Sequence, residues 1–328
     1  AVKVRHGLYQ QISDKVKEIY KIYSDKVESF GIDEAWLDIS GKVKTMEEAF
    51  RIAENIRKHV VEEIGITVSI GVSFNKVFAK LGSDIKKPNA TTVISKDNYK
   101  QIVWPLPVRE LLYVGRVTRE KLNRANIFTI GQLATTDLEF LKQLLGKNGE
   151  SLYKFANGDD DENVEGERVR EKSIGNSTTC SKDLTTEKEV EAVIYMLAET
   201  VAQRLREAKS YCREVALWIK DNTLNSYNKQ KKLDYETNLA SDIGRVCFVL
   251  FKEIYNWETT VRAIGVRTSK LCDAPQQYNF FTDEQNFLKK QKMEETVDTL
   301  RERFGHNIIK RANFTDDDLT NLGNFEVT

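Results

Sequence analysis

An acidic stretch in the middle of the chain limits most strongly what the chain can fold into. Residues 158–172, GDDDENVEGERVREK, contain very few apolar side chains. A segment of this composition has little to bury, which is typical of a linker between domains. The chain has 328 residues, enough for two or three domains of ordinary size. The sequence therefore predicts separate domains, each with its own hydrophobic core.

Composition and charge narrow the classes of function. The chain is 40% hydrophobic and 30% charged, and no apolar run approaches the length of a membrane helix. Its 50 basic side chains balance its 50 acidic ones, so any nucleic-acid site must be a local patch. The four cysteines are scattered and the three histidines lie far from them, which disfavours a thiolate or imidazole metal site. Free thiols fit a reducing cytoplasm.

The segments before the acidic stretch alternate between helical and extended patterns. Apolar residues recur at helical spacing over 7–24 and 45–64, and a short basic helix is expected over 75–87. Short strands are expected around Gly31, over 66–73 and over 91–94. We therefore expect an α/β domain over 1–104, a small helical domain over 105–158 and a linker over 159–172.

The segments after it follow the order β-α-β-β-α-β. This order predicts a split ferredoxin-like sandwich over 173–273, with one open sheet face. A polar tail over 274–328 contains one amphipathic helix around 288–304. The whole chain is thus predicted to be a multi-domain α+β protein.

Two adjacent acids stand at the start of the apolar run in GIDEAWLDIS. Neighbouring residues on a regular strand point to opposite faces, so Asp33 and Glu34 either mark a solvated strand tip or lie at a bend that turns both toward one charged ligand. Carboxylates together with substrate phosphates are what Mg²⁺ prefers. For an arbitrary pair of acids the solvated tip is the more common outcome.

A basic cluster follows in NKVFAKLGSDIKKPN, residues 75–89. Lys76 and Lys80 are four residues apart and share a helical face, and Lys87 precedes the proline that ends the helix. A solvated basic face is the ordinary interpretation. Lysines close to two carboxylates also suit the neutralisation of a triphosphate.

Gly115 in YVGRVTREKL is expected in a tight hairpin between two helical segments. Such a glycine lets backbone N–H groups approach a phosphate without reading a base, and Arg116 follows it directly. A helical hairpin that needs one glycine for its turn is an equally good interpretation of this stretch alone.

Taken together, these stretches resemble the Y-family translesion DNA polymerases of the bacterial UmuC/ImpB/DinB type. GIDEAWLDIS resembles the second acidic motif of that family, and NKVFAKLGSDIKKPN resembles its palm signature. YVGRVTREKLNRANIFTIGQLA is similar to its thumb hairpin, which has a helix-hairpin-helix-like turn. KSIGNSTTC and the β-α-β-β-α-β unit are similar to its little-finger domain. The resemblance covers nearly the whole chain in the right order.

The resemblance implies an error-prone DNA-directed DNA polymerase that acts on primer-template DNA and deoxynucleoside triphosphates. It makes Asp33 and Glu34 ligands of two Mg²⁺ ions in nucleotidyl transfer to a primer 3′-hydroxyl. It places Lys87 on the incoming triphosphate, with Lys80 in support. It also implies a sliding clamp as partner, no membrane and a monomeric polymerase in the bacterial cytoplasm, associated with the nucleoid.

The family's first acidic motif, steric-gate aromatic residue and fingers precede the stretch with which this sequence begins. We therefore expect a partial palm and no detectable nucleotide incorporation by this chain alone. An alternative is a non-catalytic accessory protein that binds DNA and the clamp. A metal-dependent phosphotransferase unrelated to nucleic acid is disfavoured by the thumb and little-finger patterns.

Two further groups of residues are candidates for binding partners. Sequence-independent contacts with DNA phosphates are expected from the linker and from the strand REVALWIK, whose two faces the sequence leaves undecided. The peptide QYNFF, residues 277–281, resembles a clamp-docking peptide, although Tyr278 stands where an aliphatic residue is usual. The candidate DNA contacts are Gly115, Arg116, Arg168, Arg170, Lys172, Arg213 and Lys220, and the candidate clamp contacts are Gln277, Phe280 and Phe281.

Overall fold

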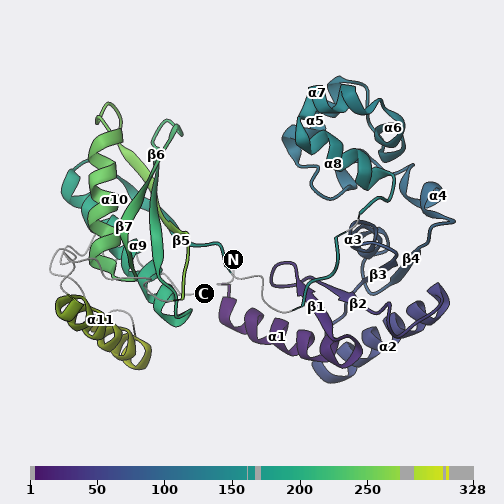
Figure 1. Ribbon diagram of the computed structural model, residues 1–328, viewed down its shortest axis with the longest axis horizontal. Helices are drawn as coiled ribbons and strands as arrows, with labels where there is room; N and C mark the ends of the chain where they lie inside the picture. The colour runs from purple at the N-terminus through teal and green to yellow at the C-terminus, as the bar shows by residue number, and fades with distance from the viewer. Residues whose placement is uncertain (1–3, 161, 167–170, 274–283, 306–307, 310–328) are drawn as a thin grey trace. The chain divides into compact units, whose positions relative to one another are not determined.

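The computed structural model describes residues 4–160, 162–166, 171–273, 284–305 and 308–309. The chain divides into two compact units, Ala1–Val169 and Arg170–Thr328, and each has a hydrophobic core of its own. Helices and strands are mixed in both units (Figure 1), which confirms the α+β class.

Unit 1 begins with two helices and a β-hairpin. The hairpin strands are antiparallel, with Val27 opposite Leu37, and the turn between them contains Gly31 at a φ of +80°. The two helices pack through apolar side chains such as Ile19 and Val60. The elements are α1 (His6–Tyr23), β1 (Lys26–Ser29), β2 (Ala35–Asp38) and α2 (Met46–Ile64).

A parallel strand pair and its crossover helix follow in unit 1. Strands β3 (Ile70–Ser73) and β4 (Thr91–Ile94) are joined by helix α3 (Lys76–Ile85). The helix lies very close to β3, because a Cβ added at Gly71 would stand only 1.8 Å from the Ala79 carbonyl oxygen. This tight contact fixes the position of α3 and of the lysines that it carries.

The rest of unit 1 is a group of short helices. Their core side chains, such as Leu122 and Leu152, form one continuous cluster with Phe78 and Leu81 of α3. The helical part is therefore not packed separately from α3. Its elements are α4 (Tyr99–Val103), the 3₁₀ turn η1 (Val108–Glu110), α5 (Arg116–Arg124), α6 (Ile130–Thr135), α7 (Leu138–Leu145) and α8 (Lys147–Ala156).

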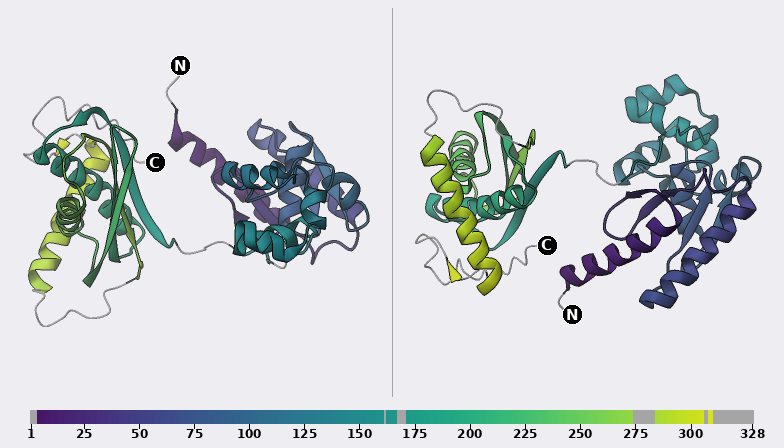
Figure 2. Two further views of the ribbon diagram at one scale, coloured as in Figure 1. Left: turned by 90° about the horizontal axis from the view of Figure 1, so that it is seen from above. Right: turned by 60° about the horizontal axis from the view of Figure 1, so that its bottom comes forward.

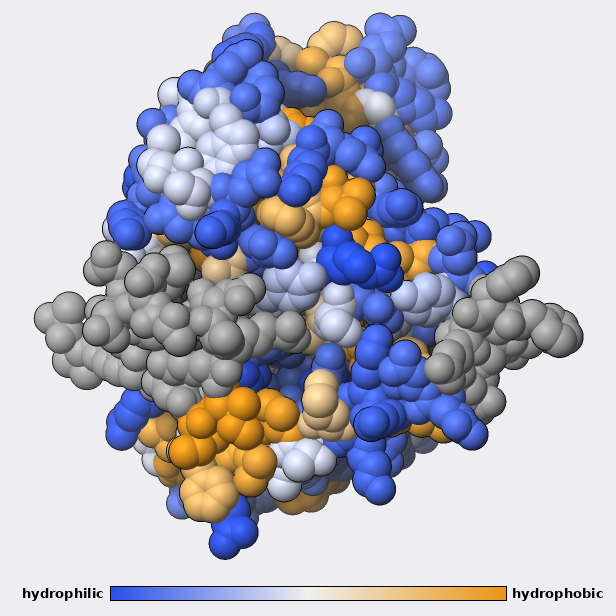
Figure 3. All heavy atoms as spheres, turned by 90° about the vertical axis from the view of Figure 1, so that its left-hand side faces the viewer, coloured by the Kyte–Doolittle hydropathy of each residue, from blue (hydrophilic) through white to orange (hydrophobic). Residues whose placement is uncertain are grey.

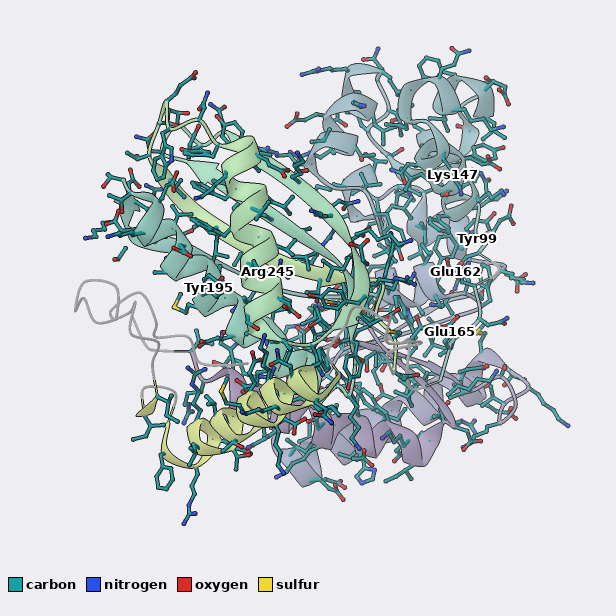
Figure 4. The ribbon with its side chains drawn as sticks, turned by 60° about the vertical axis from the view of Figure 1, so that its left-hand side comes forward. Tyr99, Lys147, Glu162, Glu165, Tyr195 and Arg245 are labelled. Carbon is teal, nitrogen blue, oxygen red and sulfur yellow. The ribbon has the colours of Figure 1, made fainter. Side chains whose placement is uncertain are left out.

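Unit 2 contains a four-stranded antiparallel sheet covered by helices on one face (Figures 1 and 2). The strand order is β5-β8-β6-β7, so each β-α-β connection passes over one intervening strand, which confirms the predicted split arrangement. The two helices cross closely at Gly244, where an added Cβ would lie 2.5 Å from the ring of Tyr195 (Figure 4). The elements are β5 (Ser173–Leu184), α9 (Glu187–Glu207), β6 (Cys212–Asp221), β7 (Ser226–Thr237), α10 (Ala240–Ile254) and β8 (Val261–Ser269).

A third helix, α11 (Glu284–Phe304), also belongs to unit 2. The sequence pattern predicts a helix that begins near 288 in a polar tail. In the structure, however, Phe287 is buried and Arg206 of α9 pairs with Glu294 and Asp298 of α11. The helix is therefore part of the folded unit. Its packing depends on ion pairs that the helix pattern does not reveal.

In Figure 3 hydrophilic residues cover most of the visible face, with hydrophobic patches between them. Among the residues that the structure describes, no helix combines the length and apolar character needed to cross a membrane.

Candidate functional site

The two adjacent acids lie where the turn of the first hairpin leads into β2. The N–H of Phe30 donates to the Glu34 carbonyl oxygen at 2.8 Å and closes this turn. Asp33 is exposed, whereas the Glu34 side chain is 32% exposed and is held by a lysine. A turn therefore lies at the two acids, with Asp33 in solvent and Glu34 on Lys80, and a bend that faces both acids toward one ligand stays a prediction.

Lys80 of α3 holds that carboxylate. Its Nζ lies 3.1 Å from Glu34 Oε1 and 2.5 Å from Asp84 Oδ2. The same Asp84 carboxylate binds Lys87, with 2.5 Å between Oδ1 and Nζ. The structure thus brings the predicted residues Glu34, Lys80 and Lys87 into one network, together with Asp84, which sequence analysis did not select.

The network shifts the pKa values of Asp84 and Lys80. Partial burial by itself raises the pKa of the Asp84 carboxyl, but hydrogen bonds from Lys80 and Lys87 outweigh it and the pKa lies below the ordinary value. For Lys80, burial lowers the pKa, but the bonds to Asp84 and Glu34 outweigh burial and the pKa is raised. Asp84 and Lys80 therefore both carry their full charge at neutral pH.

A second ion pair lies one helical turn earlier on α3. Lys76 Nζ is 2.8 Å from Glu28 of β1, lies 4.8 Å from the centre of the Trp36 ring and is only 10% exposed. The interpretation of this helix as a solvated basic face is therefore wrong at Lys76. The shared face of Lys76 and Lys80 is confirmed, because both meet carboxylates of the first hairpin.

The beginning of the acidic stretch is hydrogen-bonded to the start of helix α3. Gly158 accepts a hydrogen bond from Asn75, and Asp160 accepts one from the Val77 N–H at the start of α3. Further along, Glu162 lies 3.6 Å from Lys76 and the Glu165 N–H donates to Glu28 at 2.7 Å (Figure 4). We call the described residues 158–160 and 162–166 the acidic segment. Its contacts fix the end of the helical part onto α3 and β1.

Gly115 precedes the first turn of α5 and leaves it accessible. No atom lies within 4 Å of a Cβ built on Gly115, and Arg116 is exposed. The expected hairpin between two helices is instead a turn after the 3₁₀ segment η1, and Tyr113, not the glycine, takes the positive φ of 68°. The free N–H groups of α5 suit a phosphate.

A groove of about 620 Å³ lies beside α5. It is apolar at Pro107 and Phe128 and basic at Arg119 and Arg124, and neither arginine forms an ion pair with the part of the chain that the structure describes. The sequence gives no direct signal for this groove, because its walls come from three separate segments.

Burial along β6 shows which of its residues lie on the uncovered face of the unit 2 sheet, which we call the open face. Val215, Leu217 and Ile219 are buried beneath the helices, so Trp218 and Lys220 point to the open face. Arg267 of β8 lies on the same face and was missed by sequence analysis. From the strand register, the face comprises Ser173, Gly175, Ser177, Thr179, Glu214, Ala216, Trp218, Lys220, Ser226, Asn228, Gln230, Lys232, Ala263, Gly265, Arg267 and Ser269.

Two glycines make room on this face. A Cβ at Gly175 would lie 3.0 Å from the Arg267 side chain, and one at Gly265 would lie 3.2 Å from the Trp218 ring. Lys220 Nζ lies 5.7 Å from the centre of the same ring. The centre of the open face thus carries the aromatic ring of Trp218 and the cations Lys220 and Arg267, with glycines between them.

The other predicted DNA contacts of unit 2 differ in their surroundings. Arg213 stands at a register shift of β6 and pairs with the buried Glu236 at 3.4 Å, away from the set that contains Lys220. Lys172 is exposed just before β5. Arg168 and Arg170, and the candidate clamp contacts Gln277, Phe280 and Phe281, lie outside the described residues.

Protein-family models match the chain in three consecutive parts. The impB/mucB/samB family model matches residues 1–84, a model described as the thumb domain of DNA polymerase-iota matches 110–160, and the impB/mucB/samB family C-terminal domain model matches 171–280. Helix α11 lies beyond the last match.

Curated relatives match over nearly the whole chain. DNA polymerase IV of Acetivibrio thermocellus is 45% identical over 318 residues, which is 95% of this chain and 79% of that protein. DNA polymerase IV of Clostridium acetobutylicum is 32% identical over 308 residues, covering 94% and 77% of the two chains. Among solved structures, a Y-family DNA polymerase chimera of Dbh and Dpo4 aligns at a TM-score of 0.74 and 24% identity, covering 83% of this chain and 79% of that one.

Fold, site and sequence therefore define the class: the chain belongs to the Y family of translesion DNA polymerases, as its resemblance predicts. Within that family its curated relatives bear the name DNA polymerase IV, the bacterial DinB type.

Proposed function

We propose that this chain supplies the palm, thumb and little-finger functions of a template-directed DNA polymerase that copies damaged DNA. The observation that carries the proposal is the network Glu34–Lys80–Asp84–Lys87, which joins an acid at a hairpin turn to the lysines of α3. A nucleotidyl-transfer site needs carboxylates beside cations, because metal ions and a triphosphate must meet there. We also propose that the palm, thumb, linker, little-finger domain and tail meet at 104/105, 158/159, 172/173 and 273/274.

The carboxylates suit Mg²⁺ as the metal. In the described part of the chain no three His, Cys, Asp or Glu side chains gather into a metal cage. Mg²⁺ commonly binds through one or two carboxylates and completes its shell with water and substrate phosphates, so Asp33 and Glu34 are a fitting donor set. Bound there, the metal supplies charge stabilisation for phosphoryl transfer and a more acidic primer hydroxyl.

The chain's own side chains have distinct tasks in this proposal. Glu34 and Asp33 hold the metal, and Lys80 and Lys87 neutralise the triphosphate as charge develops on the leaving pyrophosphate. Gly115 and Arg116 contact a backbone phosphate at the start of α5. The open face with Lys220, together with Arg168, Arg170 and Lys172, holds the DNA without reading its sequence, whereas Arg213, which pairs with Glu236, is not part of that face.

The catalytic test separates chemistry from DNA binding. In the full-length gene product, an Asp33→Ala, Glu34→Ala double variant should lose primer extension by at least about 10³-fold, because nucleotidyl transfer requires the metal that these carboxylates hold. Its affinity for primer-template DNA should stay within about twofold, a change of less than 0.5 kcal/mol. Near-normal extension by the double variant contradicts the assignment of both acids. DNA binding without any extension in the wild type favours the accessory-protein alternative.

We also propose that the protein is a monomeric polymerase that works at the nucleoid and that it binds a sliding clamp. What supports it is the sequence QYNFF, with Phe280 and Phe281 as apolar anchors and Gln277 at the pocket rim. Titration calorimetry should show at least about tenfold weaker clamp binding for a Phe280→Ala, Phe281→Ala variant, equivalent to 1.4 kcal/mol. Equal affinity, with the same circular dichroism spectrum, rules out this peptide as the docking segment.

A further inference from the structure

Asp84 uses both of its carboxylate oxygens on lysines. Oδ2 lies 2.5 Å from Lys80 Nζ and Oδ1 lies 2.5 Å from Lys87 Nζ. Lys80 continues the network to Glu34 at 3.1 Å, so charges alternate in sign along four side chains. One carboxylate therefore sets the separation of the two ammonium groups that the proposed function places near the triphosphate.

The exposure of these side chains argues against a mainly stabilising role. Lys80 is 17% exposed, Asp84 38% and Lys87 55%. Ion pairs with this much solvent contact contribute little to folding stability. Their effect is geometric, because long lysine side chains otherwise sample many rotamers. A carboxylate between two lysines removes that freedom before a ligand arrives.

We propose that Asp84 is a positioning residue that arranges Lys80 and Lys87 for the triphosphate of an incoming nucleotide. The inference rests on the proposed function and adds to it a residue that touches neither metal nor substrate. A lysine ammonium has three N–H donors, so while both remain bound to Asp84, Lys80, which also binds Glu34, keeps one donor for a phosphate oxygen and Lys87 keeps two. Neither lysine then has to release Asp84 when the nucleotide binds.

Electrostatics alone predicts the opposite outcome for a substitution. Asp84 carries a negative charge, and its removal lessens repulsion toward a triphosphate. If Asp84 only neutralised the lysines, an uncharged residue at this position would strengthen nucleotide binding. If Asp84 positions them, the same residue weakens binding, because both ammonium groups must be ordered during association. The sign of the change therefore distinguishes the two roles.

The experiment measures binding of a deoxynucleoside triphosphate with Ca²⁺, by titration calorimetry, to the full-length protein on primer-template DNA. Asp84→Asn should weaken binding about five- to tenfold, the effect of freeing two long side chains. Asp84→Glu, which keeps the charge and both oxygens, should recover most of the affinity. Glu139→Gln is the matched control, since Glu139 pairs with Lys142 at 3.0 Å on α7 and is 71% exposed. That variant should bind like the wild type.

A second readout separates positioning from a general loss of structure. In steady-state primer extension Asp84→Asn should raise KM for the nucleotide more than it lowers kcat, with the thermal unfolding midpoint unchanged. Unchanged or tighter binding by Asp84→Asn overturns the inference, as does failure of Asp84→Glu to recover affinity at wild-type stability. A wild-type protein that binds no nucleotide contradicts the proposed function itself, and the inference with it.

Discussion

Arg206 of α9 and Glu294 of α11 form an ion pair of 2.6 Å in which the side chains are only 7% and 10% exposed. The guanidinium also binds Asp298 at 2.7 Å, and the Glu294 carboxylate accepts a hydrogen bond from the Ala240 N–H at the start of α10. Three helices therefore meet at one charged centre. The buried pair explains why α11 is held against unit 2.

Removing the arginine from this centre should be strongly destabilising. Arg206→Ala leaves two partly buried carboxylates without their cation, and breaking a buried pair in this way costs about 3–5 kcal/mol. Urea unfolding of the full chain, followed by circular dichroism, measures the loss. Arg245→Ala is the control, because Arg245 is 61% exposed and lies 3.6 Å from Asp242, so its loss should cost less than about 1 kcal/mol. Equal effects of the two variants contradict a structural role for the buried centre.

Glu294 should make stability depend on pH in one direction. Burial raises the pKa of its carboxyl above the ordinary value of 4.5 and outweighs the bonds from the Ala240 N–H and Arg206. The unfolded chain therefore loses this proton at lower pH than the folded protein does. The stability contributed by this group is complete below about pH 4.5 and declines as the pH rises through the raised pKa.

The comparison of Glu294→Gln with the wild type isolates that effect. The amide cannot ionise, so the stability of the wild type relative to this variant should decrease as the pH rises from about 4.5, by about 1.4 kcal/mol for each unit by which the pKa is raised. Urea unfolding at several pH values gives the curve. Glu295→Gln, an exposed neighbour, should show no such trend. A relative stability that rises with pH contradicts the assignment.

The spacing of apolar residues within single segments is sufficient to predict most of the helices and strands. Alternation along β6 and helical spacing along α9 concern residues close in sequence, and Val190, Ile194 and Leu205 recur at helical spacing and are buried. The strand order of the sheet and the shielding of one face also follow from the order of the elements.

Ionic contacts between distant segments were not predictable in the same way. Lys76 and Glu28 are 48 residues apart, and Arg206 and Glu294 are 88 apart. A lysine or glutamate in a helix has the same local pattern whether it meets solvent or a buried partner. The residue patterns drew attention to Glu34 and Lys80, and the family resemblance implied their roles, but neither indicated Asp84.

The acidic segment should detach more readily when its contact with α3 is removed. Asp160 accepts a hydrogen bond from the Val77 N–H at 3.3 Å, and a carboxylate at a helix N-terminus is worth about 0.3–1 kcal/mol. Asp160→Ala should therefore speed amide hydrogen exchange at Glu165, whose N–H is bound to Glu28, by up to about fivefold. Asp159→Ala makes the same charge change at an exposed neighbour and should have no effect. Equal rates of amide hydrogen exchange at Glu165 in the two variants would contradict a stabilising contact between Asp160 and α3.

The open face of the unit 2 sheet supplies the last prediction. Lys220 and Arg267 lie on this face, and neither forms an ion pair with another described residue. Each phosphate contact releases counterions, so the logarithm of the binding constant falls with the logarithm of salt concentration by about 0.9 for each contact on duplex DNA. A Lys220→Ala, Arg267→Ala variant should therefore bind duplex DNA more weakly and reduce this slope by up to about 2.

The control for this prediction lies on β7, where Lys231 is exposed on the opposite side of the strand from Gln230 and Lys232. Lys231→Ala removes a positive charge from the same unit without altering the open face, so its salt slope should equal that of the wild type. Fluorescence anisotropy with DNA of two unrelated sequences measures slope and selectivity together. The double variant should lose affinity equally for both sequences, because backbone contacts carry no base information. A slope that falls equally in the Lys231 variant assigns the effect to net charge, and a loss confined to one DNA sequence contradicts backbone binding by this face.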